Sequence, residues 1–214
     1  FDPARVSTVY QGVSPRFHPR PEADLRPALA LFGLAPGSYA LCVSTIEPRK
    51  RVAELVQAWR LLPPAIRNRW PLVLAGSSGW LSEAILDEIA AAEREGWLRY
   101  IRYVDEAALP LLYAGARLFV YPSIYEGFGL PPVEAMASGI PVVVADASCL
   151  PEVTGGAALL VAPQDIDGFA RHLEQALTDP AWRDAARDRG LAVAATYSWD
   201  LCAQQTAHIY GMLR

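Results

Sequence analysis

Short apolar segments of strand length alternate along this chain with longer segments in which apolar residues recur at helical spacing. This alternation constrains the fold strongly, because strands joined through helices pair in parallel, with helices covering both faces of the sheet. The expected strands are Val6–Tyr10, Tyr39–Ser44, Leu72–Ala75, Leu98–Arg102, Leu118–Tyr121, Pro141–Val144 and Ala158–Val161. The expected helices are Arg51–Leu62, Ser82–Glu95, Glu106–Ala114, Pro132–Ser138, Asp165–Leu177, Pro180–Thr196 and Ser198–Leu213.

Several strand candidates, such as Pro141–Val144, are continuously apolar, which is typical of strands buried on both faces. The 214 residues suit one domain, and a hydrophobic content of 52% is enough to fill its core. The sequence therefore predicts an α/β fold with a doubly wound, Rossmann-like parallel sheet.

Composition excludes several classes of protein. Charged residues make up 20% of the chain and the net charge is -4, so we expect no nucleic-acid partner. The three cysteines are far apart and lack metal-ligand spacing, which favours a reducing cytoplasm. No apolar run approaches the roughly 18 residues of a membrane span. The chain begins with Phe1 rather than Met and lacks signal-peptide features, so we expect it to be part of a longer protein.

In such a sheet, ligands bind beyond the carboxyl ends of the strands. The loop 122–134 follows one strand and contains Gly127 and Gly129, whose backbone could approach an anion closely. Two prolines then suit the first turn of a helix whose dipole faces the loop, with Glu134 in that turn. Each glycine alone could be a turn residue, and Glu134 alone a partner of the dipole. Together with Glu126, they favour a site for a diphosphate and sugar hydroxyls.

A second loop follows the strand Tyr39–Ser44 and places Arg49 and Lys50 at the expected start of a helix. A positive pair there opposes the helix dipole. A solvated surface would tolerate the pair, but a diphosphate would give both cations a role.

The residues Glu126, Gly127, Phe128, Gly129 and Leu130, followed by Glu134, resemble the motif of retaining GT-B glycosyltransferases of family four. The resemblance implies that Glu126 lies against the donor sugar as the catalytic residue. It implies that the amides of Gly127, Phe128, Gly129 and Leu130 hold the β-phosphate, and that Glu134 holds the ribose.

Two other loops are similar to family motifs. Glu47–Lys50 resembles Glu-Pro-Arg-Lys, whose lysine contacts the diphosphate. Many members have Gly-Arg where this chain has Ser-Thr, so either Arg49 replaces that arginine or the site has one cation fewer. Arg102–Asp105 resembles Gly-Tyr-Val and implies that Val104 contacts the base. Arg102 stands where glycine is usual and would either stack on the base or cover the rim.

The resemblance extends from Gln11–Val13 to Tyr197–Asp200. It implies that residues 1–214 form the C-terminal donor-binding half of a GT-B enzyme, with a linker at 1–20 and a closing helix at 198–214. The acceptor-binding N-terminal domain would be absent, and this half alone would be inactive.

We therefore expect a cytoplasmic hexosyltransferase of polysaccharide biosynthesis, with GDP-mannose as the first choice of donor and UDP-hexoses next. The acceptor, a glycan or a lipid-linked glycan, would bind the missing domain, which would also provide any peripheral membrane association. We expect no cofactor and no metal, because the acids are not clustered as ligands. Alternatives are half of a nucleotide-sugar epimerase, or a non-catalytic nucleotide-binding module. The lack of Gly-x-Gly-x-x-Gly after the first strand disfavours an NAD-dependent oxidoreductase.

Overall fold

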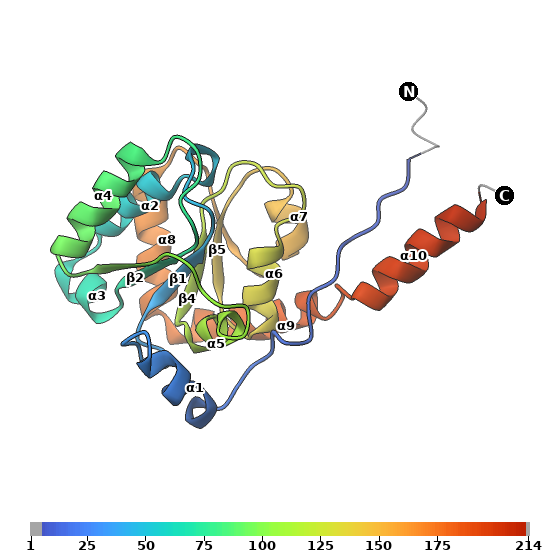
Figure 1. The fold of residues 1–214 in the computed structure, drawn as a ribbon, viewed down its shortest axis with the longest axis horizontal. Helices are drawn as coiled ribbons and strands as arrows, with labels where there is room; N and C mark the ends of the chain where they lie inside the picture. The colour runs from blue at the N-terminus through green and yellow to red at the C-terminus, as the bar shows by residue number, and fades with distance from the viewer. Residues whose placement is uncertain (1–5, 213–214) are drawn as a thin grey trace.

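A computed structural model describes residues 6–212 and contains a six-stranded parallel sheet in the order β3-β2-β1-β4-β5-β6 (Figure 1). This strand order is that of a doubly wound sheet, so the predicted fold class is confirmed. The strands are β1 Ala40–Val43, β2 Leu72–Ala75, β3 Leu98–Ile101, β4 Leu118–Tyr121, β5 Val142–Ala145 and β6 Leu159–Val161.

The centre of the sheet forms the core, and every residue of β2, β4 and β5 is buried. Their continuous apolar sequences follow from this burial on both faces. Ala40 of β1 pairs with Leu72 of β2 on one side and with Leu118 of β4 on the other, so β1 is an interior strand.

Helices cover both faces of the sheet (Figure 1). One layer contains α2, α4 and α8, and the opposite layer contains α1, α5, α6 and α9. The helical elements are α1 Glu22–Ala30, the 3-10 turn η2 Pro48–Lys50, α2 Val52–Leu61, α3 Pro64–Arg69, α4 Glu83–Arg94, α5 Leu109–Gly115, α6 Leu130–Ala137, α7 Leu150–Thr154, α8 Ile166–Thr178, α9 Pro180–Ala194 and α10 Trp199–Met212.

The expected strand Val6–Tyr10 is wrong. These residues form a mostly exposed segment outside the sheet, with no strand assigned to it. Their apolar and polar pattern suits a strand, but a strand also needs a neighbour with which to pair its backbone groups. The pattern also missed α1, α3 and α7, because α3 and α7 are short and α1 contains Pro27 in its interior.

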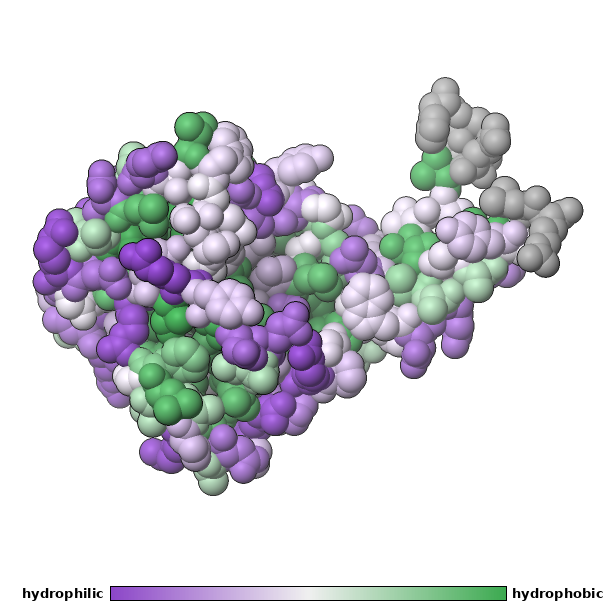
Figure 2. All heavy atoms as spheres, viewed as in Figure 1, coloured by the Kyte–Doolittle hydropathy of each residue, from purple (hydrophilic) through white to green (hydrophobic). Residues whose placement is uncertain are grey.

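The last helix, α10, projects from the body beside the N-terminal segment (Figure 1). Leu213 and Arg214 of the expected closing helix, and residues 1–5 of the expected linker, lie outside the described residues. No residue of α10 between Trp199 and Met212 is buried. Apolar and polar side chains are interleaved on its surface (Figure 2). Across residues 6–212, each helix is too short or too polar to cross a membrane.

Candidate functional site

Two loops meet where the connectivity of the sheet reverses. Strands β1 and β4 are neighbours, but β1 leads to β2 on one side and β4 leads to β5 on the other. Loop connections diverge at such a point and leave a crevice at the carboxyl ends of the two strands. The loop 44–51 after β1, here called the β1 loop, and the loop 122–129 after β4, here called the β4 loop, follow these two strands.

The β1 loop folds differently from its expected form. Arg49 and Lys50 lie in the 3-10 turn η2, and Arg51 then adopts a left-handed conformation with φ 52° before α2 begins. The two cations therefore do not occupy the first turn of α2, and the helix dipole does not oppose them as the sequence suggested. Lys50 is held in the interior, with only 8% of its side chain exposed.

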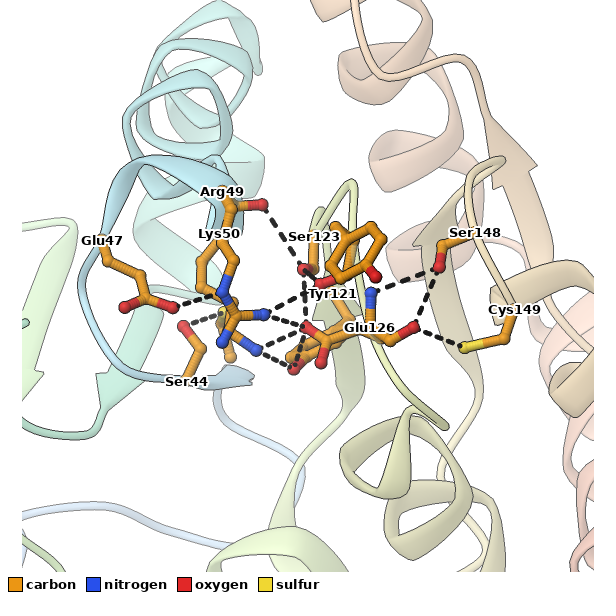
Figure 3. Close-up of polar contacts among 11 residues, drawn as sticks. Ser44, Glu47, Arg49, Lys50, Tyr121, Ser123, Glu126, Ser148 and Cys149 are labelled. Carbon is orange, nitrogen blue, oxygen red and sulfur yellow. Dashed lines mark hydrogen bonds and ion pairs between the residues drawn. The ribbon is translucent and has the colours of Figure 1, made fainter. Parts of the chain in front are cut away.

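The carboxylate of Glu126, in the β4 loop, contacts polar groups of both loops (Figure 3). Its Oε1 atom accepts hydrogen bonds from Lys50 Nζ, from Ser123 Oγ at 2.6 Å and from Tyr121 OH at 2.9 Å. Arg49 Nη1 lies 3.4 Å from the same oxygen. The Glu126 side chain is 12% exposed, so this ion pair with Lys50 is largely shielded from water.

The contacts of Glu126 have two consequences. Burial raises the pKa of the carboxyl group, but hydrogen bonds from Lys50, Ser123 and Tyr121 outweigh it and lower the pKa below its ordinary value. All four donor groups, from Lys50, Arg49, Ser123 and Tyr121, contact Oε1. Within residues 6–212 no donor contacts Oε2. One oxygen of Glu126 is therefore anchored and the other remains available as an acceptor.

Arg49 connects Glu126 to the outer part of the β1 loop. Its Nε atom lies 2.6 Å from Glu47 Oε1, and its Nη1 donates to the carbonyl of Tyr125 at 2.8 Å. The Arg49 side chain is 40% exposed, whereas that of Glu47 is 9% exposed. The guanidinium group is thus oriented by the protein but accessible from outside.

The β4 loop and the start of α6 also contain backbone N–H groups without a protein acceptor among the described residues. Within the described chain, the amides of Gly127, Phe128, Gly129 and Leu130 donate no hydrogen bond to protein groups. Gly129, with φ 89°, is the N-cap of α6, and a Cβ atom there would lie 2.9 Å from Leu150 Cδ2. Gly127 does not have a positive φ, and a Cβ atom on it would meet nothing within 4 Å. Gly129 is required by the fold, whereas Gly127 keeps space open outside the backbone.

Glu134 lies beside a hollow at the start of α6. Helix α6 begins at Leu130 rather than Pro132, so Glu134 is in the second turn and not the first. The hollow has a volume of about 260 Å³ and is lined by Gly12, Ser14, Arg16, Phe17, Glu106, Leu109, Leu130, Glu134 and Trp199. No ion pair involves Glu134 in residues 6–212, and burial raises the pKa of its carboxyl group.

The loop after β3 contains Arg102 and Val104. Val104 is half-buried against the core, and it is not among the residues that line the hollow beside Glu134. Arg102 is exposed, and its guanidinium carbon lies 5.5 Å from the centre of the Tyr100 ring. The structure thus brings Arg49, Lys50 and Glu126 together and leaves Val104 apart from them.

Sequence reasoning missed several groups that hold the β4 loop. Ser148 Oγ donates to the Glu126 carbonyl at 3.0 Å and accepts from the Glu126 amide at 3.3 Å. Cys149 Sγ lies 3.5 Å from the same carbonyl. Tyr121 and Ser123 were also missed, although they adjoin the motif. Polar groups that are buried at the end of a strand need hydrogen-bond partners, and this was the signal that could have identified them.

Metal binding finds no support in side-chain clusters. Within residues 6–212, no group of three or more His, Cys, Asp or Glu side chains could hold a metal ion. The two loops instead contain cations and backbone N–H groups, the two kinds of group that proteins use to bind anions.

Fold and site together define an α/β protein with a cluster of charged residues at the switch point of a doubly wound sheet. Residues 36–192 match the sequence model of the family described as Glycosyl transferases group 1. The chain belongs to this family of glycosyltransferases, as its motifs predicted.

Curated relatives agree with this assignment. The chain is 46% identical over 209 residues to O-antigen chain mannosyltransferase B of Escherichia coli, covering 98% of this chain and 55% of that protein. It is 35% identical over 178 residues to the serotype-specific mannosyltransferase WbdA of Escherichia coli, covering 81% of this chain and 21% of that protein. The chain therefore spans about half the length of the first relative and about a fifth of the second.

Solved structures share the fold. Sucrose-phosphate synthase from Thermosynechococcus elongatus matches with a TM-score of 0.80 and 28% identity, over 95% of this chain and 51% of that chain. HepE of Anabaena, in complex with UDP and glucose, matches with a TM-score of 0.84 over 96% of this chain and 57% of that chain. At 21% identity, the second likeness concerns the fold alone.

Proposed function

We propose that this chain binds the nucleoside diphosphate of a nucleotide sugar, with GDP-mannose as the first choice and UDP-hexoses next. The complete protein would transfer mannose, with retention at the anomeric carbon, to a glycan or lipid-linked acceptor in the cytoplasm. The observation that carries the proposal is the meeting of Lys50 and Arg49 with Glu126, near four backbone N–H groups that have no partner within residues 6–212. The likeness to mannosyltransferase B supports mannose.

Transfer breaks the bond between the anomeric carbon and a β-phosphate oxygen, which leaves negative charge on the diphosphate. In the proposal, Lys50 and Arg49 offset this charge, together with the amides 127–130 and the start of α6. Lys50 exchanges its contact with Glu126 for one with phosphate. Gly127 supports this arrangement, because the absence of a side chain lets a phosphate approach the backbone.

The sugar acquires positive charge as the bond breaks, and a carboxylate nearby would stabilise it. We assign this role to Glu126, because its Oε1 atom is anchored and its Oε2 atom is available. Glu134 would hold the ribose hydroxyl groups, with its carboxylate beside the hollow at α6. Val104 would contact the base. The acceptor would bind a part of the protein that lies beyond this chain.

Titration calorimetry with GDP and UDP, with and without EDTA, tests the proposal. We expect binding that EDTA does not change, because cations rather than a metal would hold the diphosphate. Binding that disappears with EDTA would refute the metal-free site, and no heat with either nucleotide would refute the donor site. Incubating the complete protein with a panel of nucleotide sugars then distinguishes transfer from epimerisation and from binding alone.

A further inference from the structure

We propose that Tyr10 and Tyr197 are positioning residues for the β4 loop. Through Phe128 and α7, they connect the segments by which the chain enters and leaves the domain to the backbone on both sides of Glu126. The inference rests on the proposed function, because it assigns to these tyrosines the alignment of Glu126 with the donor sugar.

The incoming and outgoing segments cross in direct backbone contact. Gly12 is buried, and a Cβ atom on it would lie 2.1 Å from the backbone nitrogen of Trp199. Beside it, the Val13 amide donates to the Tyr197 carbonyl at 3.2 Å. Because only glycine permits so close an approach, Gly12 fixes the contact between residues 10–13 and 197–199, here called the crossing.

An aromatic cluster connects the crossing to the β4 loop. The ring of Phe128, from the β4 loop, lies 5.4 Å from that of Tyr197 in an edge-on arrangement. It lies 6.2 Å from the ring of Tyr10, and the two tyrosine rings are 5.9 Å apart. These are contact distances for aromatic pairs. The side chain between Gly127 and Gly129 therefore packs on the crossing.

Helix α7 provides a second connection. Tyr197 OH donates to the Val153 carbonyl at 3.1 Å, and Tyr10 OH donates to the carboxylate of Glu152. At the other end of the same helix, Leu150 packs under Gly129. Ser148, just before α7, holds both backbone groups of Glu126. One short helix thus contacts both the crossing and the loop.

The two connections converge on the same backbone. A shift of the crossing relative to α7 would displace the backbone of Glu126 through Ser148. It would displace the backbone of residues 127–129 through Phe128. Because the reaction requires Glu126 at a defined distance from the sugar, a small displacement lowers the rate by a larger factor than it weakens ground-state binding at the amides 127–129.

Tyr10→Phe, Tyr197→Phe and the double variant test the inference in the complete protein. Each keeps the ring and removes one hydrogen bond to α7. Tyr210→Phe, on the exposed surface of α10, is the matched control. We expect kcat to fall about fivefold or more in the double variant, by a larger factor than the donor KM rises, while Tm matches the control. A double variant with the kcat of the control would overturn the proposal.

Hydrogen exchange of the ligand-free protein gives a measurement that needs no nucleotide. The peptide 122–130 should exchange faster in the double variant, and the peptide 142–145 of β5 should not change. Unchanged exchange in 122–130 would contradict the coupling, and so would an equal increase in both peptides, which would indicate general destabilisation. If no nucleotide binds at all, the proposed function fails, but the exchange result still decides the coupling.

Discussion

Glu126→Gln keeps the shape of the side chain but removes the charge that neutralises Lys50. Breaking a buried ion pair by removing one partner costs about 3–5 kcal/mol, because the remaining charge is buried alone. Here the amide oxygen can still accept from Lys50, and the side chain is not fully enclosed, with 12% exposed. We therefore expect a loss of about 2–3 kcal/mol in the free energy of unfolding. For a chain of 214 residues this corresponds to about 4–12 °C in Tm.

The same change should not weaken nucleotide binding. In the unliganded protein a diphosphate must compete with Glu126 for Lys50, and Gln is a weaker competitor because it carries no charge. We expect GDP to bind the variant at least as tightly as the wild type. Sugar transfer by the complete protein should nevertheless fall by roughly a hundredfold or more, because the charge opposite the developing cation is gone.

Thermal unfolding with and without GDP, calorimetry and a transfer assay measure these three quantities. Glu22→Gln is the control, because it removes the same charge from an exposed pair with Arg26, which is worth about 1 kcal/mol or less. Two results would refute the reasoning: a Tm for Glu126→Gln equal to that of the control, or a loss of GDP affinity as large as that caused by removing Lys50.

The pH dependence of the same pair gives a further check. The pKa of Glu126 is lowered in the folded protein, so its contribution to stability is fully present above the unfolded value of about 4.3. That contribution is lost as the pH falls through the lower, folded pKa. We expect the stability difference between wild type and Glu126→Gln to be constant near neutral pH and to shrink below about pH 4. A difference that persists unchanged in acid would exclude the ion pair as its source.

Three further predictions concern the other groups of the site. Lys50→Ala should weaken GDP binding by about 1.5–3 kcal/mol in calorimetry, and an unchanged Kd in the folded variant would exclude contact with the diphosphate. Glu134→Gln should weaken GDP binding but keep or raise stability at pH 7, because burial raises the pKa of Glu134 and its ionised form is penalised in the fold. A drop in its Tm would contradict this. Gly127→Ala should weaken GDP binding with little change in Tm, whereas Gly129→Ala should cost about 1–3 kcal/mol of stability through its positive φ. Equal Tm losses in the two variants would show that both glycines are structural.

Much of the fold could be predicted because its signals are local. The apolar runs of β2, β4 and β5 are buried on both faces, and burial of this kind is directly visible in a sequence. Val6–Tyr10 has a suitable pattern but no strand beside it, and the presence of a partner is not a local property. The start of α6 was misplaced by two residues, because the prolines indicated the first turn but not which residue caps it.

The motifs named candidate residues of the site but not their arrangement. The motifs identified Lys50 and Glu126 as residues that would both face a ligand, one the diphosphate and the other the sugar. In the structure they contact each other, and the supporting groups Tyr121, Ser123 and Ser148 enter only through that geometry. A sequence motif indicates which chemistry is present, but not how the groups are paired before a ligand binds.

The sequence by itself determined the fold class, the positions of six strands and the two loops that carry the site, because hydrophobic period and turn residues act over a few neighbouring positions. Only the tertiary structure decided that Lys50 meets Glu126, that Ser148 holds the β4 loop, and that Gly12 crosses Trp199. These contacts join residues far apart in the chain. Their distances depend on the order in which the strands pair and on the packing of helices against the sheet, and neither is encoded in any one segment.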